Sequence, residues 1–367
     1  MKKKILLINF FLVLFIIVTL ELVTGYFLRF KNYRNISFLY VLRKFNTKEL
    51  GITKIKKINE LKENNEKRIY PAYLYDPQVH PINSDQYWFG HLPNSGIVHC
   101  KESSGWTVFK TNKFGFRKTL NQNLNKPFQL LVLGDSYVEG ACVNNPNDIP
   151  SQLSLIRNQN VFNAGRGGTG PLFQLGLLKE LLATKDNSFS LSKNGKLLWI
   201  IFTGNDLKNL AEEKTTLLSN YITDDFELNY FDKLKKLSVE KEYFFKSIFK
   251  NLSSNNLIGN HSYGETVVPN SFSQSTALND LGIIFNEFVK ITNRKKIDLN
   301  IVILEDHPRY NSEVMIETQK KLKSLCVEKK SKCLFIKMKE FRQNNLFNHL
   351  TPSEYKKLSI KISEFLG

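Results

Sequence analysis

The sequence predicts an α/β fold, a three-layer α/β/α sandwich of the flavodoxin-like type around a central five-stranded parallel sheet, preceded by an N-terminal transmembrane helix. Two observations predict the sandwich. Short, continuous apolar runs alternate with helical patterns from Lys126 to the C-terminus, and strands that are buried on both faces of a parallel sheet have this pattern. In addition, 367 residues of which 42% are hydrophobic can fill a large core.

The N-terminal segment predicts a membrane anchor. Three lysines follow Met1, the stretch Ile5–Leu20 carries no charge, and apolar character continues to Leu28. As a helix, Ile5–Leu28 is long enough to cross the hydrocarbon core of a bilayer, which is about 30 Å thick. A cleavable signal peptide is the alternative, since Val23–Gly25 offers small residues for cleavage. The apolar length favours the uncleaved anchor.

The distribution of charge bears on orientation and on partners. A short basic N-terminal tail usually stays inside the cell, so we expect a single-pass protein whose main domain is extracytoplasmic (periplasmic), although Arg29, Lys31 and Arg34 on the other flank favour the opposite orientation. The net charge is +18, and residues 1–70 carry 15 Lys/Arg against 5 Asp/Glu. Such a segment suits an anionic bilayer surface or an acidic glycan. Nucleic acid is not an expected partner, because no zinc-finger spacing or RNP-type aromatic motif is present.

The chain divides into an anchor (1–30), a juxtamembrane stalk and lead-in (31–125) and a main domain (126–367) with an insert at 207–278. Short strands and turns are expected within 71–120, and the polar insert is a candidate lid. The expected strands of the main domain are 129–133, 160–163, 196–202, 299–304 and 333–337, and its expected helices are 149–157, 172–184, 279–294, 312–330 and 352–365.

A serine follows the first of these strands. In Gly134–Gly140 (GDSYVEG), Ser136 stands between a strand and a helix, where a nucleophile is exposed at the edge of the sheet and neighbouring N–H groups face an incoming oxyanion. Gly134 permits a tight turn, and Asp135 is expected to fix the loop by hydrogen bonds rather than to do chemistry.

Three further polar or Gly-rich turns follow the later strands. Asn163–Gly170 (NAGRGGTG) lacks the Lys-Ser/Thr of a Walker motif and is expected to supply a backbone N–H donor. Asn205 follows the third strand, and its amide can donate to the same oxyanion. His349 precedes the last helix and can act as general base. The carboxyl ends of parallel strands form the ligand-binding edge of such a sheet, so we expect these groups to meet Ser136 there.

The sequence holds four cysteines, Cys100, Cys142, Cys326 and Cys333. None forms a CxxC pair, so we expect no metal site, and no motif predicts a cofactor. Cys326 and Cys333 are close enough in sequence to form a disulfide if the domain lies outside the cytoplasm. Free buried thiols are the alternative.

The order Ser, Gly, Asn, His and the motifs around these residues resemble the SGNH/GDSL hydrolase superfamily over residues 126–367. The resemblance implies Ser136 as nucleophile, Gly168 and Asn205 as oxyanion-hole donors, and His349, within NHLTPSEY, as the base. Thr111–Arg117 (TNKFGFR) is similar to the lead-in of bacterial membrane-anchored members of this superfamily. Such proteins are often associated with surface glycans and their acyl groups.

The fifth motif departs from the family pattern Asp-x-x-His, because Leu346 stands where the acid is usual. Three interpretations follow: a Ser–His dyad, a replacement acid, or a degenerate site. Glu305 and Asp306 follow the fourth strand and are candidates for the replacement acid. His307 is a rival base that ranks below His349.

The expected function is that of a serine esterase acting on ester groups, above all O-acetyl groups, of cell-envelope glycans or similar polar esters. With water as the acyl acceptor the protein is a hydrolase, and with a sugar hydroxyl it is an O-acyltransferase on surface polysaccharide. A catalytically degenerate glycan-binding envelope protein is the alternative from another class.

Overall fold

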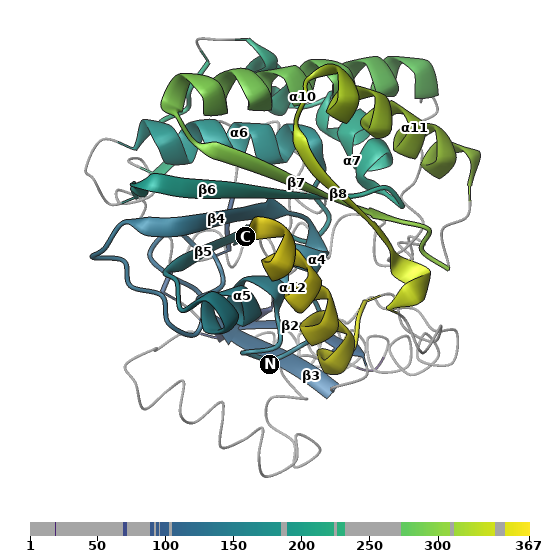
Figure 1. The fold of residues 1–367 in the computed structure, drawn as a ribbon. Coiled ribbons are helices and arrows are strands. Elements are labelled where there is room, and N and C mark those ends of the chain that lie inside the picture. The colour runs from purple at the N-terminus through teal and green to yellow at the C-terminus, as the bar shows by residue number, and fades with distance from the viewer. Residues whose placement is uncertain are drawn as a thin grey trace, which may run out of the picture. The chain divides into compact units, whose positions relative to one another are not determined.

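Figure 1 shows the computed structural model of the chain, which describes residues 69–71, 89–91, 93–94, 96–102, 105–184, 189–223, 226–231, 273–308, 312–341 and 349–367, together with Thr19. Apart from Thr19, these residues belong to one compact unit. The predicted anchor, the stalk before residue 69 and most of the predicted lid lie outside the described residues. Within the described part of the chain, no helix has the length and apolar character needed to cross a bilayer.

The central sheet has five strands, and every neighbouring pair is parallel. Its order is β5-β4-β6-β7-β8, so the first strand along the chain lies between the second and the third. This is the flavodoxin-like order, and the prediction of a five-stranded parallel α/β sheet is confirmed. The strands are β4 (Phe128–Gly134), β5 (Val161–Gly165), β6 (Leu191–Phe202), β7 (Asp298–Glu305) and β8 (Lys332–Lys337).

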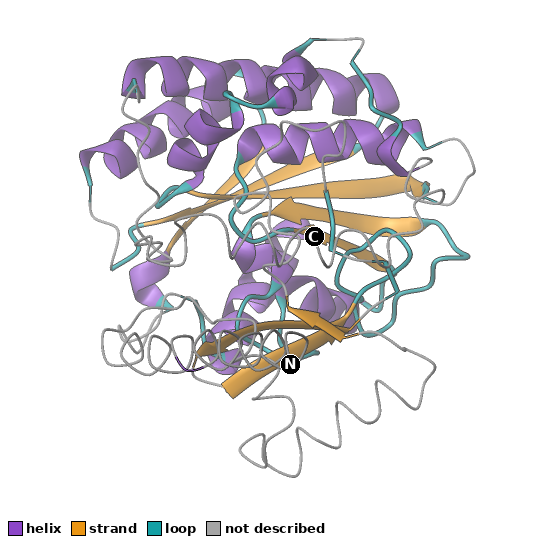
Figure 2. Cartoon of the chain, turned by 180° about the vertical axis from the view of Figure 1, so that it is seen from behind, coloured by secondary structure: helices purple, strands orange, loops and turns teal. Residues whose placement is uncertain are grey.

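Helices cover both faces of the sheet (Figures 1 and 2). In α/β proteins the crossover helices shield strands that are apolar on both faces, as here for β4 and β5. One face carries α6 (Pro171–Ala183), α7 (Asp206–Glu213), α10 (Gln274–Lys295) and α11 (Glu313–Glu328). The other carries α4 (Ser136–Glu139), α5 (Ile149–Arg157) and α12 (Pro352–Leu366).

Local capping explains where the helices begin. The Thr351 side chain accepts the N–H of Glu354, and the Glu354 carboxylate accepts the N–H of Thr351. This capping box starts α12, and Pro352 lies in the first turn of the helix. The Ser273 side chain caps α10, so this helix begins before its amphipathic part and earlier than the predicted residue 279. β6 likewise begins before the predicted residue 196, because the polar start of the strand pairs with β4 through Leu191 and Phe128.

A small second sheet precedes the main domain. Two of its strands lie within residues 71–120, where the sequence predicts short strands and turns. It has the order β1-β2-β3, with β1 (Ile69–Pro71) parallel to β2 (Gly96–Glu102) and β2 antiparallel to β3 (Gly105–Lys110). The chain then turns at Asn112, whose Oδ1 accepts the N–H groups of Phe114 and Phe116. The rings of Phe114 and Phe116 pack edge-on against Phe162 of β5, which joins the lead-in to the core of the main domain.

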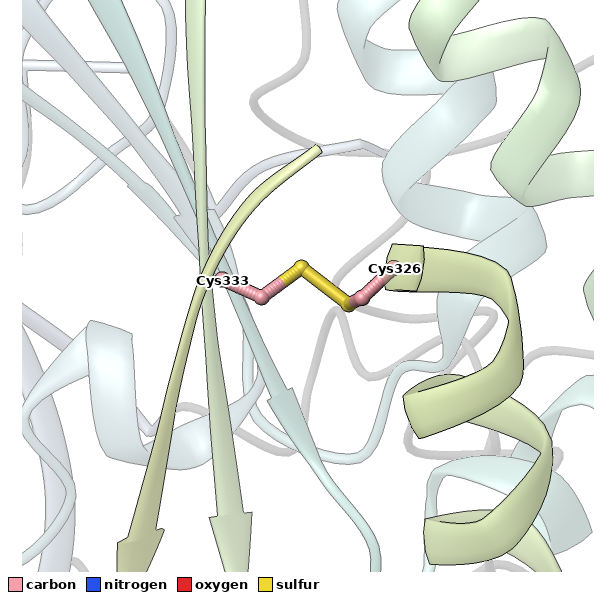
Figure 3. The surroundings of a disulfide bond; sticks show 2 residues. All are labelled: Cys326 and Cys333. Atoms are coloured by element: carbon pink, nitrogen blue, oxygen red, sulfur yellow. A yellow bond between two sulfur atoms is a disulfide. The ribbon is translucent and has the colours of Figure 1, made fainter. Parts of the chain in front are cut away.

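Of the two alternatives for Cys326 and Cys333, a disulfide or free thiols, the structure has the disulfide (Figure 3). It ties the end of α11 to the start of β8 with a Cα–Cα distance of 6.2 Å, which is within the usual range. Cys142 is disulfide-bonded as well. The described residues contain no group of three or more His, Cys, Asp or Glu side chains that could hold a metal ion.

Candidate active site

The structure brings Ser136 and His349 together. The Oγ of Ser136 lies 3.1 Å from Nε2 of His349, across 213 residues of sequence. This is hydrogen-bond distance, which is what a serine nucleophile and a general base would require. Both side chains are half-buried, as are Gly168 and Asn205, whereas most residues around them are buried. Ser136 therefore lies among mostly buried neighbours without being fully buried itself.

Ser136 begins a very short helix, α4, directly after β4. Asp135 is its N-cap, and Asp135 Oδ1 accepts the N–H of Tyr137 at 2.9 Å. Gly140 ends the helix with a left-handed φ of 79°, a conformation that glycine adopts without strain. The predicted role of Asp135 as the residue that fixes this loop agrees with these bonds.

The packing of α12 explains how His349 reaches Ser136. β8 is the edge strand farthest from β5, yet α12 crosses back to pack against α5, on the face of the sheet that also carries α4 (Figure 1). His349 stands just before the start of α12. The ring of Tyr137, the residue after the nucleophile, lies 5.8 Å from the His349 ring.

The second nitrogen of His349 faces sulfur. Its Nδ1 lies 3.7 Å from Sγ of Cys142. A disulfide sulfur has no hydrogen and can act only as a weak acceptor, so this contact favours the tautomer with the proton on Nδ1. That tautomer leaves the lone pair of Nε2 free to take the proton of Ser136, as a general base requires.

The two candidate replacement acids have other partners. Glu305 lies 3.2 Å from Nζ of Lys323. Asp306 lies 3.3 Å from Nζ of Lys339 and 3.5 Å from Nε2 of Gln319. Leu346 lies outside the described residues, and the undescribed segment 342–348 has no Asp or Glu in its sequence. Glu305 and Asp306 are thus each paired with a lysine, and Asp306 also with Gln319.

His307, the rival base, is buried at 1% exposure with its ring 5.4 Å from that of Phe202. Its ring is therefore buried against an aromatic ring at the end of β6. His349 is the histidine that lies at hydrogen-bond distance from Ser136. The ranking of the two histidines in the sequence agrees with this arrangement.

The predicted oxyanion donors occupy the turns after the two strands that flank β4. Gly168 has a φ of 74°, which only glycine adopts readily. Asn205 is the N-cap of α7, but its side chain makes no capping hydrogen bond, and its Oδ1 is buried without a partner. The amide therefore has hydrogen-bonding capacity that the start of α7 does not use. The oxyanion roles of both residues remain predictions.

Two buried carboxyls, Asp135 and Asp206, lie beneath these turns. Each accepts one backbone N–H at 2.9 Å, Asp135 from Tyr137 and Asp206 from Phe202. The other oxygen of each carboxyl is buried without a hydrogen-bond partner. Burial raises the pKa of Asp135 to about 7. Burial and the charge of Asp135 raise the pKa of Asp206 well above its usual value, which favours the protonated form of this carboxyl.

Replacing Asp206 with asparagine is expected to make stability less dependent on pH. Because the folded pKa of Asp206 is raised, its favourable contribution is complete below the unfolded pKa of about 4 and is lost as pH rises through the folded value. The amide mimics the protonated carboxyl and does not titrate. The variant should therefore become progressively more stable relative to wild type as pH rises above about 4, measured by urea unfolding at several pH values. The exposed Asp298→Asn is the control, and equal differences for both variants would contradict the shift.

Sequence reasoning missed the contribution of the lead-in to this site. Arg117, from the TNKFGFR motif, is buried and donates through Nη1 to the carbonyl oxygens of Glu139 and Gly140 at the end of α4. His91 and His99 contact the carboxylate of Glu139. The motif was a visible signal that the lead-in belongs to the domain, but neither histidine stands in a recognisable pattern.

Comparisons with known proteins concern the fold. No family model matches the sequence, and the search of curated proteins found no match. The chain is similar in structure to a protein of the G-D-S-L family from Desulfitobacterium hafniense DCB-2, described as lipolytic, with 14% identity and a TM-score of 0.36 over 65% of this chain and 99% of that one. It is also similar to AlinE4, an SGNH-hydrolase family esterase, with 14% identity and a TM-score of 0.32 over 66% of this chain and 95% of that one.

Proposed function

We propose that the protein is a serine hydrolase of the SGNH type that cleaves ester bonds. The observation that carries the proposal is the 3.1 Å contact between Ser136 Oγ and His349 Nε2. The tautomer favoured by the Cys142 contact adds to it, because it leaves Nε2 able to accept the proton. A serine beside a correctly oriented imidazole is the minimum apparatus for acyl transfer.

In the proposed reaction, Oγ of Ser136 attacks the ester carbonyl while Nε2 of His349 takes the hydroxyl proton. The N–H groups of Ser136 and Gly168 and the amide of Asn205 hold the oxyanion of the tetrahedral intermediate, and each donor stabilises it by about 3 kcal/mol. Collapse of the intermediate breaks the ester bond, and the departing alcohol receives the proton from His349. Water then attacks the acyl-enzyme by the same steps and releases the acid.

Leu346 stands where the family pattern has an acid, and this bears on the expected kcat of ester hydrolysis. A weak sulfur acceptor orients His349 less strongly than an aspartate does, and it does not stabilise the imidazolium that forms. In a serine protease triad, removing only the acid costs less than removing the nucleophile or the base. A Ser–His dyad is therefore a working site with a moderate kcat.

The proposed substrates are ester groups, chiefly O-acetyl, on glycans of the cell envelope. The net charge of +18 supports an acidic polymer as partner. The disulfides at Cys326–Cys333 and Cys142 support a domain outside the cytoplasm, attached through the N-terminal apolar segment. Transfer to a sugar hydroxyl differs from hydrolysis only in the acceptor. A glycan-binding protein with a degenerate site is the second candidate, which Leu346 favours.

A fluorophosphonate probe tests the proposal directly. Such a probe should label the purified protein stoichiometrically, and peptide mass spectrometry should locate the adduct on Ser136. Wild-type protein should also hydrolyse p-nitrophenyl acetate. If the folded protein neither labels nor turns over ester, the degenerate-site candidate replaces the esterase. Including an O-acetylated oligosaccharide with and without an acceptor sugar then separates hydrolysis from transfer.

A further inference from the structure

A second group of charged side chains lies beside Ser136 and has no part in the proton transfer between serine and histidine. Its centre is Glu139, the last residue of α4, which is 1% exposed. Glu139 Oε1 lies 2.5 Å from His91 Nε2, and Oε2 lies 3.1 Å from His99 Nε2. Oε2 also accepts the N–H of Gly167 at 2.9 Å. One buried carboxylate thus joins the nucleophile helix, the lead-in and the loop after β5.

The hydrogen bond from the Gly167 N–H to Glu139 Oε2 is the contact that bears on catalysis. Gly167 directly precedes Gly168, the predicted oxyanion donor, and Glu139 lies one helical turn after Ser136. A Cβ built on Gly167 would lie 2.8 Å from Glu139 Oε2, 3.5 Å from Ser136 Cβ and 3.8 Å from His99 Nε2. The carboxylate, the nucleophile and the second histidine therefore surround a single backbone position. The Glu139 carboxylate therefore connects α4, which begins at Ser136, to the loop that carries Gly168.

The surroundings of Glu139 keep it charged and fixed. Burial acts to raise its pKa, but the charge of His99 and the hydrogen bonds from both histidines hold the pKa well below its usual value. Burial and Arg166 lower the pKa of His91 to about 4, so this ring is neutral at pH 7. Arg166 Nη1 contacts both ring nitrogens of His91 and lies 3.5 Å from Oε1 of Glu139, so a cation also faces this carboxylate. A charged acceptor makes these hydrogen bonds stronger than neutral ones.

We infer that Glu139 is a positioning residue, which holds the Gly167–Gly168 loop against α4 so that the N–H of Gly168 faces the oxyanion formed at Ser136. This inference rests on the proposed function and adds to it a residue outside the four that the family resemblance names. A donor contributes to catalysis only if it is preorganised within a fraction of an ångström. Loss of Glu139 should leave the Ser136–His349 pair intact and reduce stabilisation of the transition state.

The test compares Glu139→Gln with Glu180→Gln. Glu180 is a matched control, because it is buried at 2% exposure and also accepts two backbone N–H groups, those of Leu228 and Tyr230, but it contacts none of the candidate site residues. Both variants are expected to lower the melting temperature. Only Glu139→Gln should lower kcat for p-nitrophenyl acetate, by about 10- to 100-fold with KM within about twofold. Its affinity for an arylboronic acid, which forms a tetrahedral adduct on the serine, should fall in parallel.

A folded Glu139→Gln protein with wild-type kcat and boronate affinity would overturn the inference, as would an equal loss of kcat in Glu180→Gln. If Glu139→Gln does not fold, His99→Ala carries the test, since it removes one partner of Oε2 and leaves the Gly167 bond. It should lower kcat several-fold, and an unchanged kcat would count against the inference. Failure of the proposed function itself is distinct, because wild-type protein would then show neither turnover nor labelling.

Discussion

Replacing His349 with alanine is expected to lower kcat for ester hydrolysis by about 10⁴-fold, and Ser136→Ala should cost at least as much. The reason is the 3.1 Å contact between Ser136 Oγ and His349 Nε2. Without the imidazole, the serine hydroxyl keeps its proton near neutral pH and is a weak nucleophile. The measurement is p-nitrophenyl acetate turnover at several pH values, together with the rate of fluorophosphonate labelling.

The double variant and a second histidine serve as controls for this prediction. Residues that act as one catalytic unit are not additive, so Ser136→Ala/His349→Ala should be about as slow as either single variant. His307→Ala, which removes the rival base, should keep kcat within about threefold in the protein that remains folded. Turnover that survives in His349→Ala but is lost in His307→Ala would reverse the assignment of the base.

The sequence was sufficient to predict the five-stranded sheet because the strands of the main domain are apolar on both faces. Continuous apolar runs located all five strands, and the helix at 149–157 coincides with α5. The prediction was less complete where polar residues extend an element, as at the start of β6, whose residues Leu191–Lys193 are partly exposed. The short helix α4 was not predicted as an element, since four residues have no periodicity.

The sequence could locate only those site residues that directly follow a strand of the sheet. Ser136 and Asn205 follow buried strands, so the topology alone places them at one edge of the sheet. His349 follows β8, at the far edge of the sheet from β5, and it reaches Ser136 because α12 packs on α5. Glu139, His91 and His99 meet through tertiary packing between the lead-in and α4. Contacts of that kind leave no spacing pattern in a single sequence.

Arg117 shows what the lead-in contributes to the main domain. Its guanidinium is 1% exposed, and Nη1 donates to the carbonyl oxygen of Gly140 at 2.7 Å. Its Nη2 lies 3.2 Å from Oδ2 of Asp148, and its Nε donates to Oδ1 of Asn145 at 2.7 Å. Asp148 in turn caps α5 by accepting the N–H of Ser151. One buried cation therefore fixes the end of α4, the following loop and the start of α5.

Arg117→Met is expected to lower the free energy of unfolding by about 3–5 kcal/mol, because it leaves the carboxylate of Asp148 buried without its ion-pair partner. Arg117→Lys should recover little of this loss, since an ammonium cannot reproduce the planar fork that reaches Gly140, Asn145 and Asp148 together. Urea unfolding followed by circular dichroism measures both changes.

A second substitution tests whether the unpaired charge of Asp148 causes the loss of stability in Arg117→Met. Arg117→Met/Asp148→Asn should be more stable than Arg117→Met alone by about 1–3 kcal/mol, because the amide keeps an oxygen for the Ser151 N–H and carries no charge into the core. The exposed Arg294→Met should change stability by no more than about 0.5 kcal/mol. If Arg117→Met behaves like Arg294→Met, the TNKFGFR segment is a lead-in that covers the domain without supporting it. If the expected loss occurs, the segment is part of the framework that holds Ser136 in place, and the main domain begins before the first strand of its five-stranded sheet.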